Sequence, residues 1–255
     1  MKFKTTKYHS DLLKDHERLS AFFQAIQDYD GKTDVAFDLG CGSGILSYFL
    51  SDKFDEILSL EVNQKSSRCA QDNLADFKNI EVINSDVLEF DFPKNADLIV
   101  CEMLDTALID EEEIPVLKHA KKFLKEDGKI IPQGVINTVE LVYMQRHYVH
   151  WDENAQYESY SRPVVYSKFD FLDDISPDFE MNLSLKADRD GLINGLKITT
   201  YTLLNDDLIA GPSPMLNPPL LIPLDEKNVK ANNFIDVKLK YIMGNGIESI
   251  KTEYC

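Results

Sequence analysis

The segment of residues 35–44 constrains the fold of this chain more than any other. It reads VAFDLGCGSG, so a short apolar run ends near Asp38 and three glycines then follow at alternate positions. A buried strand that breaks into glycines before a helix lets the backbone approach a ligand, because only glycine allows both the tight turn and the missing side chain. The spacing differs from the dinucleotide fingerprint G-x-G-x-x-G, since Ile45 stands at its sixth position, and it lacks the Lys-Ser/Thr of a P-loop.

Short β-rich runs alternate with helical patterns as far as about residue 133. The expected strands cover residues 35–39, 57–60, 80–83, 97–101 and 129–131. The expected helices cover residues 12–26, 45–50, 64–74 and 115–124, the last one stopping at Asp127-Gly128. This alternation predicts an α/β fold, with a Rossmann-like, doubly wound, mostly parallel sheet and right-handed crossovers.

The character of the sequence changes between residues 132 and 135. From there on, β-rich runs such as NTVELVYM and GLKITTYTLL are separated by turn residues such as Asn245-Gly246. We therefore expect a smaller antiparallel, barrel-like β domain at residues 134–255. It would follow an N-terminal helix at residues 1–30 and an α/β domain at residues 31–133.

Acidic side chains follow the predicted strands at the edge where an open parallel sheet binds its ligands. Asp38 ends the first strand, and Glu61 ends the second about 20 residues after the first glycine, where a carboxylate can accept both hydroxyls of a ribose. Asp86 follows the third strand, where an adenine would lie, and Val87 would add backbone or apolar contact. Glu102 follows the fourth strand, at the substrate edge. The alternative for each acidic residue is a cap on the next helix.

Net charge and amino-acid composition indicate which classes of binding partner, cellular location and metal site to expect. The net charge of −17 disfavours nucleic acid and favours basic peptides or small cationic molecules, although acidity also serves solubility alone. The four cysteines form no C-x-x-C pair, which favours reduced thiols and a cytoplasmic location. The five histidines show no metal-ligand spacing, so no metal site is expected. We find no apolar run of membrane-spanning length and no signal-peptide pattern.

Four segments carry a family resemblance. The glycine loop resembles the cofactor loop of class I S-adenosylmethionine-dependent methyltransferases, rather than that of NAD-dependent oxidoreductases. Residues 101–111, CEMLDTALIDE, resemble the double-glutamate loop of protein arginine methyltransferases. Residues 9–18, HSDLLKDHER, resemble that family's N-terminal motif H-x-x-M-L-x-D-x-x-R, and residues 124–132, LKEDGKIIP, resemble its entry into the fifth strand.

The resemblance implies an enzyme that transfers the methyl group of S-adenosylmethionine and releases S-adenosylhomocysteine. It implies that the N-terminal helix covers the cofactor, with Arg18 holding the cofactor's carboxylate and His9 closing the pocket. Glu61 would bind the ribose. The further residues expected to bind cofactor are Asp38, Gly40, Gly42, Gly44, Asp86, Val87 and Glu102.

The resemblance also implies that Glu102 and Glu111 are the catalytic pair that clamps an acceptor guanidinium. A guanidinium stays protonated at neutral pH, and two carboxylates can hold its planar fork by paired hydrogen bonds. A remaining nitrogen can then direct its lone pair at the methyl group, and this alignment supplies much of the acceleration. The alternative for Glu111 is that, with Glu112 and Glu113, it only favours the dipole of the next helix.

The chain departs from the family at several points, which keeps alternatives open. Residues 103–105 read Met-Leu-Asp where the family has Trp-Met-Gly, so Asp105 would add a third carboxylate near the clamp. Residues 217–220 read NPPL where the family has a Thr-His-Trp loop. The segment of residues 151–179 is short for a dimerisation arm, which predicts a monomer or weak dimer. The alternatives are another protein side chain or a small cationic metabolite as acceptor, and a regulatory module that binds cofactor without transfer.

Overall fold

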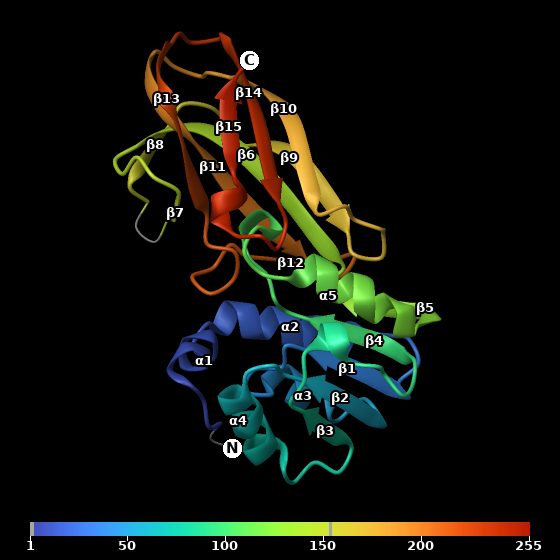
Figure 1. Cartoon of the computed structure of the whole chain (residues 1–255). Coiled ribbons are helices and arrows are strands. Elements are labelled where there is room, and N and C mark those ends of the chain that lie inside the picture. Colours follow the sequence, from blue (N-terminus) through green and yellow to red (C-terminus); the bar gives the residue numbers. More distant parts are fainter. Residues whose placement is uncertain (1–2, 153–154) are drawn as a thin grey trace.

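The computed structural model describes residues 3–152 and 155–255. Its first part contains five strands: β1 (Val35–Leu39), β2 (Glu56–Leu60), β3 (Ile80–Ile83), β4 (Ala96–Cys101) and β5 (Leu124–Ile131). They form one sheet in the order β3-β2-β1-β4-β5, and every neighbouring pair is parallel (Figure 1). The expected Rossmann-like sheet is confirmed.

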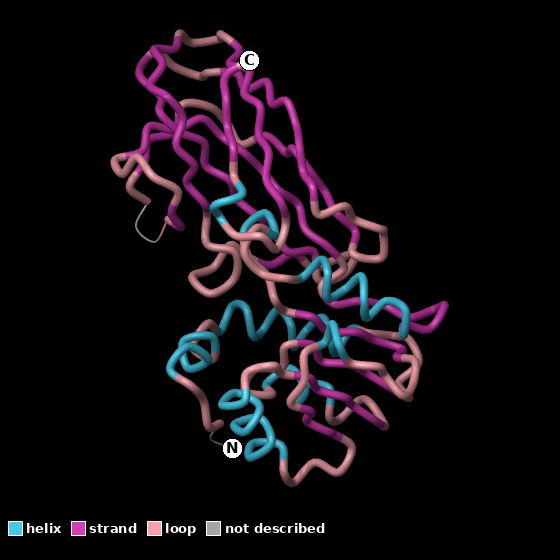
Figure 2. The backbone as a smooth tube through the Cα atoms, in the orientation of Figure 1, coloured by secondary structure: helices cyan, strands magenta, loops and turns pink. Residues whose placement is uncertain are grey.

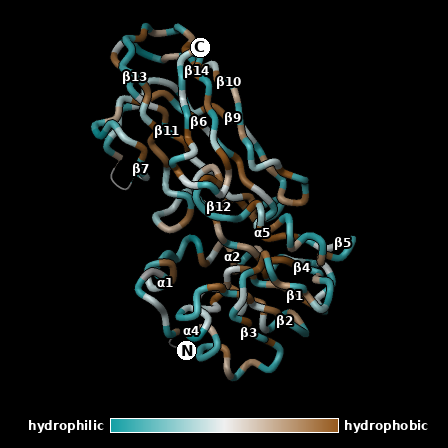
Figure 3. The backbone as a smooth tube through the Cα atoms, viewed as in Figure 1, coloured by the Kyte–Doolittle hydropathy of each residue, from teal (hydrophilic) through white to brown (hydrophobic). Residues whose placement is uncertain are grey.

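Helices accompany this parallel sheet, as Figure 2 shows. They are α1 (Lys7–Leu12), α2 (His16–Asp28), α3 (Ile45–Leu50), α4 (Gln64–Leu74) and α5 (Glu113–Ala120). Every residue of β1 and of β4 is buried. A parallel strand covered on both faces is expected to be apolar throughout, and the sequences VAFDL and ADLIVC largely follow that rule (Figure 3).

Two sequence expectations are wrong in detail. The helix expected at residues 12–26 is two helices, α1 and α2, because the side chain of Asp15 accepts a hydrogen bond from the backbone N–H of Arg18 and caps the start of α2. The helix expected at residues 115–124 starts at Glu113 and ends at Ala120. Asp127-Gly128 is not its stop signal but lies inside β5, where the register with β4 shifts.

The remaining strands are antiparallel. They are β6 (Gly134–Met144), β7 (His150–Trp151), β8 (Tyr157–Ser159), β9 (Val164–Asp170), β10 (Asp178–Lys186), β11 (Gly191–Leu203), β12 (Ile209–Ala210), β13 (Leu220–Val229), β14 (Phe234–Ile242) and β15 (Lys251–Tyr254). One sheet runs β7-β13-β11-β6-β8, with β9 also paired to β6 and β12 to β11. A second sheet has the order β10-β14-β15. These sheets confirm the expected antiparallel β region.

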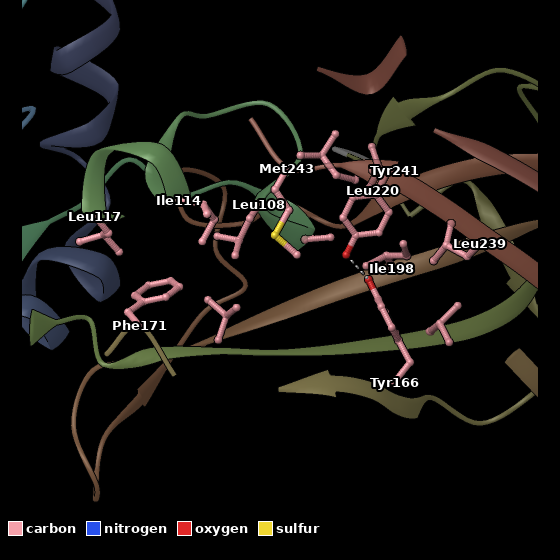
Figure 4. Close-up of a cluster of buried hydrophobic side chains, with 14 of the residues drawn as sticks. Leu108, Ile114, Leu117, Tyr166, Phe171, Ile198, Leu220, Leu239, Tyr241 and Met243 are labelled. Atoms are coloured by element: carbon pink, nitrogen blue, oxygen red, sulfur yellow. Dashed lines mark hydrogen bonds between the residues drawn. The ribbon is translucent and has the colours of Figure 1, made fainter. Parts of the chain in front are cut away.

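One hydrophobic core joins the parallel and antiparallel parts. Its buried members include Phe37 of β1, Leu117 of α5 and Leu239 of β14. Figure 4 shows Leu108 and the α5 side chains meeting residues of the antiparallel strands. The two parts are therefore packed against each other through α5 and the segment before it, which holds the edge of the parallel sheet in a fixed relation to the antiparallel strands.

Two observations bear on partners. Over the described stretches of the chain, no helix is long and apolar enough to cross a membrane. The described residues between Trp151 and Phe179 form the short strands β8 and β9 and no helix, in line with the short segment seen in the sequence. The monomer or weak dimer stays a prediction.

Candidate active site

A cavity of about 230 Å³ opens at the carboxyl ends of β1 and β4. These two strands are neighbours, and the chain first builds outward from β1 to β3 before it crosses back to β4, so the cavity lies at the topological switch point of the sheet. Seven residues singled out in the sequence line it: His9, Arg18, Gly40, Gly42, Glu61, Glu102 and Glu111.

The glycine loop forms one wall of this cavity with its backbone. The φ angles of Gly40, Gly42 and Gly44 are +70°, +56° and +85°, all in the left-handed region that favours glycine. A β-carbon on Gly42 would lie 2.7 Å from Nε2 of His9, and one on Gly40 would lie 3.0 Å from Cγ of Met103. The loop therefore has no room for side chains at these two positions.

Glu61 lies directly after β2 and faces the glycine loop. Its Oε2 accepts a hydrogen bond of 2.9 Å from the backbone N–H of Gly42, and its Oε1 accepts one of 2.7 Å from that of Asn63. The side chain is almost fully buried. These two bonds fix the carboxylate against the loop, on the wall of the cavity.

Arg18 and Glu102 form an ion pair in the lining of the cavity. Arg18 lies in the first turn of α2, and its Nη2 donates to Oε2 of Glu102, which directly follows β4. Both side chains are less than a tenth exposed. Buried charges require a partner of opposite sign, and this ion pair supplies one for each residue.

Asp15 links α2 to the antiparallel part of the molecule. While its Oδ1 caps α2, its Oδ2 accepts hydrogen bonds from the hydroxyl of Ser213 and from the backbone N–H of Met215, the latter at 3.1 Å. Met215 itself lines the cavity. No local sequence pattern predicts this link, because the two segments are about two hundred residues apart.

His9 closes the cavity from α1. Its Nδ1 lies 2.9 Å from Oγ1 of Thr6 and 3.4 Å from Oγ of Ser66. Burial lowers the pKa of His9 below its usual 6.5, an effect that outweighs the opposing charge of Glu61. Leu12 and Leu13 line the same side of the cavity.

Glu111 brings a third carboxylate to the cavity, beside those of Glu61 and Glu102. Burial raises the pKa of Glu111 above its usual 4.5, and the negative charges of Asp110, Glu102 and Glu112 raise it further. This carboxylate is therefore easier to protonate than an exposed glutamate, and a cationic ligand between Glu102 and Glu111 would relieve their mutual repulsion.

The segment that carries both glutamates, residues 102–111, is called the glutamate loop below. Residues 217–220, where the sequence lacks the family's Thr-His-Trp, pack against it. The hydroxyl of Thr106 donates to the carbonyl oxygen of Pro218 at 2.6 Å, and Asn217 is buried with its Nδ2 donating to Oγ1 of Thr202 at 2.8 Å. This segment thus supports the loop through backbone and amide groups.

A second turn of the antiparallel part holds the glutamate loop from the other side. The backbone N–H groups of Gly244 and Gly246 donate to the carbonyl oxygens of Leu108 and Ile109, at 3.0 and 2.9 Å. Both glycines have positive φ angles, +73° and +80°. The position of the glutamate loop therefore depends on strands far along the chain.

Four of the residues expected to bind cofactor do not line the cavity: Asp38, Gly44, Asp86 and Val87. Asp38 lies buried beneath the loop and accepts a hydrogen bond from the hydroxyl of Ser47. Gly44 precedes α3, Asp86 accepts from the backbone N–H of Leu88 as a helix cap, and Val87 belongs to the hydrophobic core. Their roles toward a cofactor stay predictions.

Two carboxyl groups behave differently from what the sequence indicated. Asp105 was expected to add a carboxylate near Glu102 and Glu111, but it does not line the cavity. Its side chain instead accepts hydrogen bonds from backbone N–H groups of its own loop. Glu113 lies at the start of α5, as expected, but its side chain is fully buried. An acidic residue in a first helical turn is usually exposed, so the sequence offers no local signal for this burial.

Comparisons with known proteins bear on the family and the fold of this chain. Residues 36–128 match a family model described as a methyltransferase domain. The chain is 43% identical to an uncharacterized protein of Methanothermobacter thermautotrophicus over 98% of each chain. It is 31% identical to the histone-arginine methyltransferase CARMER of Anopheles gambiae, over 54% of this chain and 24% of that protein.

A solved structure shares the fold over nearly the whole chain. It is the PRMT1 enzyme–prozyme heterotetrameric complex of Trypanosoma brucei with AdoHcy, with a TM-score of 0.83 and 17% sequence identity. The match covers 97% of this chain and 92% of that one. At this identity the likeness shows the fold and not the roles of individual side chains.

Proposed function

This chain belongs to the class I S-adenosylmethionine-dependent methyltransferases, and on that premise we propose that it methylates a guanidinium nitrogen of arginine in a basic protein or peptide. The observation that carries the proposal is the placement of Glu102 and Glu111 on one cavity beside the glycine loop. The net charge of −17 supports a cationic acceptor.

The residues of the cavity fit S-adenosylmethionine. The backbone at Gly40 and Gly42 lies on the cavity wall without a side chain, and His9 and Met103 leave no room for one. Arg18 offers a guanidinium that can pair with the cofactor's carboxylate. Glu61 already accepts two backbone hydrogen bonds, but a carboxylate has about four acceptor positions, so it retains capacity for ribose hydroxyls. S-adenosylmethionine supplies a methyl group bonded to a positively charged sulfur.

The two glutamates provide the chemistry on the acceptor side. Glu102 and Glu111 hold the guanidinium by charge-assisted hydrogen bonds and orient one nitrogen toward the methyl group. Methyl transfer to that nitrogen would form an N–C bond as the electron pair of the methyl–sulfur bond is lost to the sulfur, and the methylated group would then release one proton. Glu111 is suited to receive the proton because burial and neighbouring negative charges raise its pKa.

A second candidate acceptor is a cationic amine, either on another protein side chain or in a small metabolite. The observation that favours it is that Leu104 and Met215 are among the lining residues, so part of the cavity is apolar, whereas a planar guanidinium would gain from further polar partners. The same two carboxylates would attract an ammonium group, although without the paired hydrogen bonds of a guanidinium.

The test measures transfer of labelled methyl from S-adenosylmethionine to an arginine-rich peptide and to a matched peptide with lysine at every arginine position. We expect label in the arginine peptide, and we expect Glu102→Gln to lower the rate by about 100-fold or more, because it removes charge at the reacting group. Glu112→Gln is the matched control, since Glu112 is an exposed neighbour of the same chemistry.

The outcomes separate the candidates. Label in the lysine peptide alone supports the amine acceptor and contradicts the guanidinium. Equal rates for Glu102→Gln and Glu112→Gln would contradict the assigned role of Glu102. Calorimetry with S-adenosylhomocysteine checks that each variant still binds the cofactor product.

A further inference from the structure

We propose that Asp105 and Glu113 are positioning residues that fix Glu102 and Glu111 at the two ends of the glutamate loop. The proposal rests on the function proposed above, which assigns the acceptor to those two glutamates. Neither Asp105 nor Glu113 lines the cavity, so each would act through the backbone that carries a glutamate.

Glu113 fixes the end of the loop that carries Glu102. Its Oε2 accepts a hydrogen bond of 3.1 Å from the backbone N–H of Met103 and lies 3.5 Å from Sγ of Cys101, which donates to it. Cys101 and Met103 are the residues on either side of Glu102. A single buried oxygen therefore holds the chain before and after Glu102, which restricts the direction in which that side chain leaves the backbone.

The surroundings of Glu113 indicate a neutral carboxyl group. The side chain has no exposed surface, and Oε1 has no hydrogen-bond partner among the described residues. Burial raises the pKa of Glu113 well above its usual 4.5, and the charges of Glu102 and Glu111 add to the effect. A neutral acid can hold the backbone without adding a third negative charge to the pair that faces the acceptor.

Asp105 fixes the end of the loop that carries Glu111. Its Oδ2 accepts hydrogen bonds from the backbone N–H groups of Ile109 and Asp110, at 3.2 and 3.0 Å, and its Oδ1 accepts one from that of Glu111, at 3.4 Å. Three consecutive N–H groups thus point at one carboxyl group that is 7% exposed. This arrangement orients the backbone of Glu111 in the way that Glu113 orients that of Glu102.

The centre of the loop explains why both ends need an anchor. Ala107 and Leu108 both have φ angles of +61°, in a region that side chains of L-residues disfavour. Both residues are fully buried, so the turn is held by its surroundings. Without anchors at each end, a strained turn of this kind would relax and change the separation of Glu102 and Glu111.

The test for Glu113 compares Glu113→Met, which removes the carboxyl oxygens, with Glu113→Gln, which keeps one oxygen acceptor. We expect hydrogen exchange at the amide of Met103 to rise by about tenfold or more in Glu113→Met and to be largely restored in Glu113→Gln. Methyl transfer to the acceptor that the wild type uses should fall and recover in parallel. The matched control is Glu126→Gln, an exposed glutamate outside the glutamate loop and the cavity, which should leave both readouts unchanged.

The test for Asp105 has the same form. Asp105→Ala removes the acceptor of three amides, and Asp105→Asn keeps one oxygen. We expect exchange at the amides of residues 109–111 to rise by about tenfold or more in Asp105→Ala and less in Asp105→Asn. Asp110→Asn is the matched control, because Asp110 is exposed and adjoins the same amides.

Two results would overturn the proposal. One is unchanged exchange at these amides in Glu113→Met and Asp105→Ala. The other is a loss of transfer that the conservative variants do not recover although they fold as the wild type does. If the wild type methylates no arginine peptide, only the assignment of a guanidinium acceptor fails. The positioning roles of Asp105 and Glu113 are still tested by hydrogen exchange and by methyl transfer to whichever acceptor the wild type uses.

Discussion

Arg18 and Glu102 form a buried ion pair that joins the first turn of α2 to the carboxyl end of β4. The two residues are 84 positions apart in the chain. Glu102 thereby binds the guanidinium of a residue of the same chain. This is the chemical group that we propose for the acceptor substrate. The pair also makes Arg18 and Glu102 interdependent, because loss of either leaves the other as a buried charge.

Replacing Arg18 with lysine tests its role toward the cofactor. Lysine keeps the positive charge but loses the planar fork that pairs with a carboxylate through two parallel hydrogen bonds. We expect Arg18→Lys to weaken the binding of S-adenosylhomocysteine by about tenfold or more, which corresponds to about 1.4 kcal/mol. Isothermal titration calorimetry measures it.

Lys14→Ala is the control for Arg18→Lys, since Lys14 is an exposed cation of the same segment and pairs with Asp11 at the surface. It should bind the cofactor product like the wild type. An unchanged affinity in Arg18→Lys would mean that the charge alone, and no paired hydrogen bond, is what the cavity uses.

Replacing Gly42 with alanine tests the glycine loop. The new β-carbon would lie 2.7 Å from Nε2 of His9, and the backbone is at a φ of +56°. We expect Gly42→Ala to lower affinity for S-adenosylhomocysteine by more than about tenfold, because the loop or α1 must move and left-handed backbone strain adds to the clash.

A second substitution separates the two causes. In a His9→Ala background the clash disappears while the backbone strain remains, so Gly42→Ala should cost less there than in the wild type. The two substitutions are therefore expected to be non-additive in a double-mutant cycle. Strict additivity would show that His9 does not constrain the loop.

The sequence predicted the parallel sheet and much of the cavity because both follow local rules. Apolar runs mark β1 and β4, and carboxyl ends of parallel strands share one edge, so Glu61 and Glu102 had to lie near the glycine loop. The break between α1 and α2 is not visible in the periodicity, because the apolar stripe continues through it. The break is marked by Asp15, whose side chain caps the start of α2.

The inward-facing carboxyl groups were beyond prediction for a different reason. Asp105 and Glu113 look like surface residues in the sequence but are buried, and the centre of the loop that carries Asp105 is held by a strand about ninety residues later. Thr200, for example, accepts the backbone N–H of Ala107 at 2.8 Å. Contacts at such separations leave no periodic signal near either carboxyl group.

Replacing Ser213 with alanine tests the link between α2 and the antiparallel part. Asp15 would lose the hydroxyl donor but keep the N–H groups of Arg18 and Met215. We expect Ser213→Ala to reduce the free energy of unfolding by about 1 kcal/mol, because it removes one part-buried hydrogen bond from a carboxylate that keeps two other donors.

The same substitution should act locally. Hydrogen exchange in α1 and in the first turn of α2 should become faster, because the anchor of this segment is weakened. Ser51→Ala is the control, since the hydroxyl of Ser51 is exposed and donates only to the carbonyl of Tyr48 within the same turn of chain. Equal exchange in the two variants would contradict a role for Asp15 and Ser213 in holding α2.

Asp38 should make stability depend on pH. Burial raises its pKa from the usual 3.8 to about 7. Between these two values the unfolded chain releases the proton while the folded protein keeps it, so the free energy of unfolding falls as pH rises from about 4 to about 7 and is then level. At about 1.4 kcal/mol for each pH unit between the two pKa values, the loss approaches about 4 kcal/mol.

Asp38→Asn removes this titration and keeps an oxygen that can accept the hydroxyl of Ser47. The difference in free energy of unfolding between wild type and Asp38→Asn isolates Asp38 from Asp105, whose pKa burial also raises to about 7. Urea unfolding at about pH 5 and about pH 8 should show the wild type losing stability relative to the variant at the higher pH. The prediction is contradicted if the stability difference between wild type and variant is the same at both pH values, or if it shifts in favour of the wild type at the higher pH. Asp38 would then be ionised in the folded protein and held more strongly than its contact with Ser47 indicates.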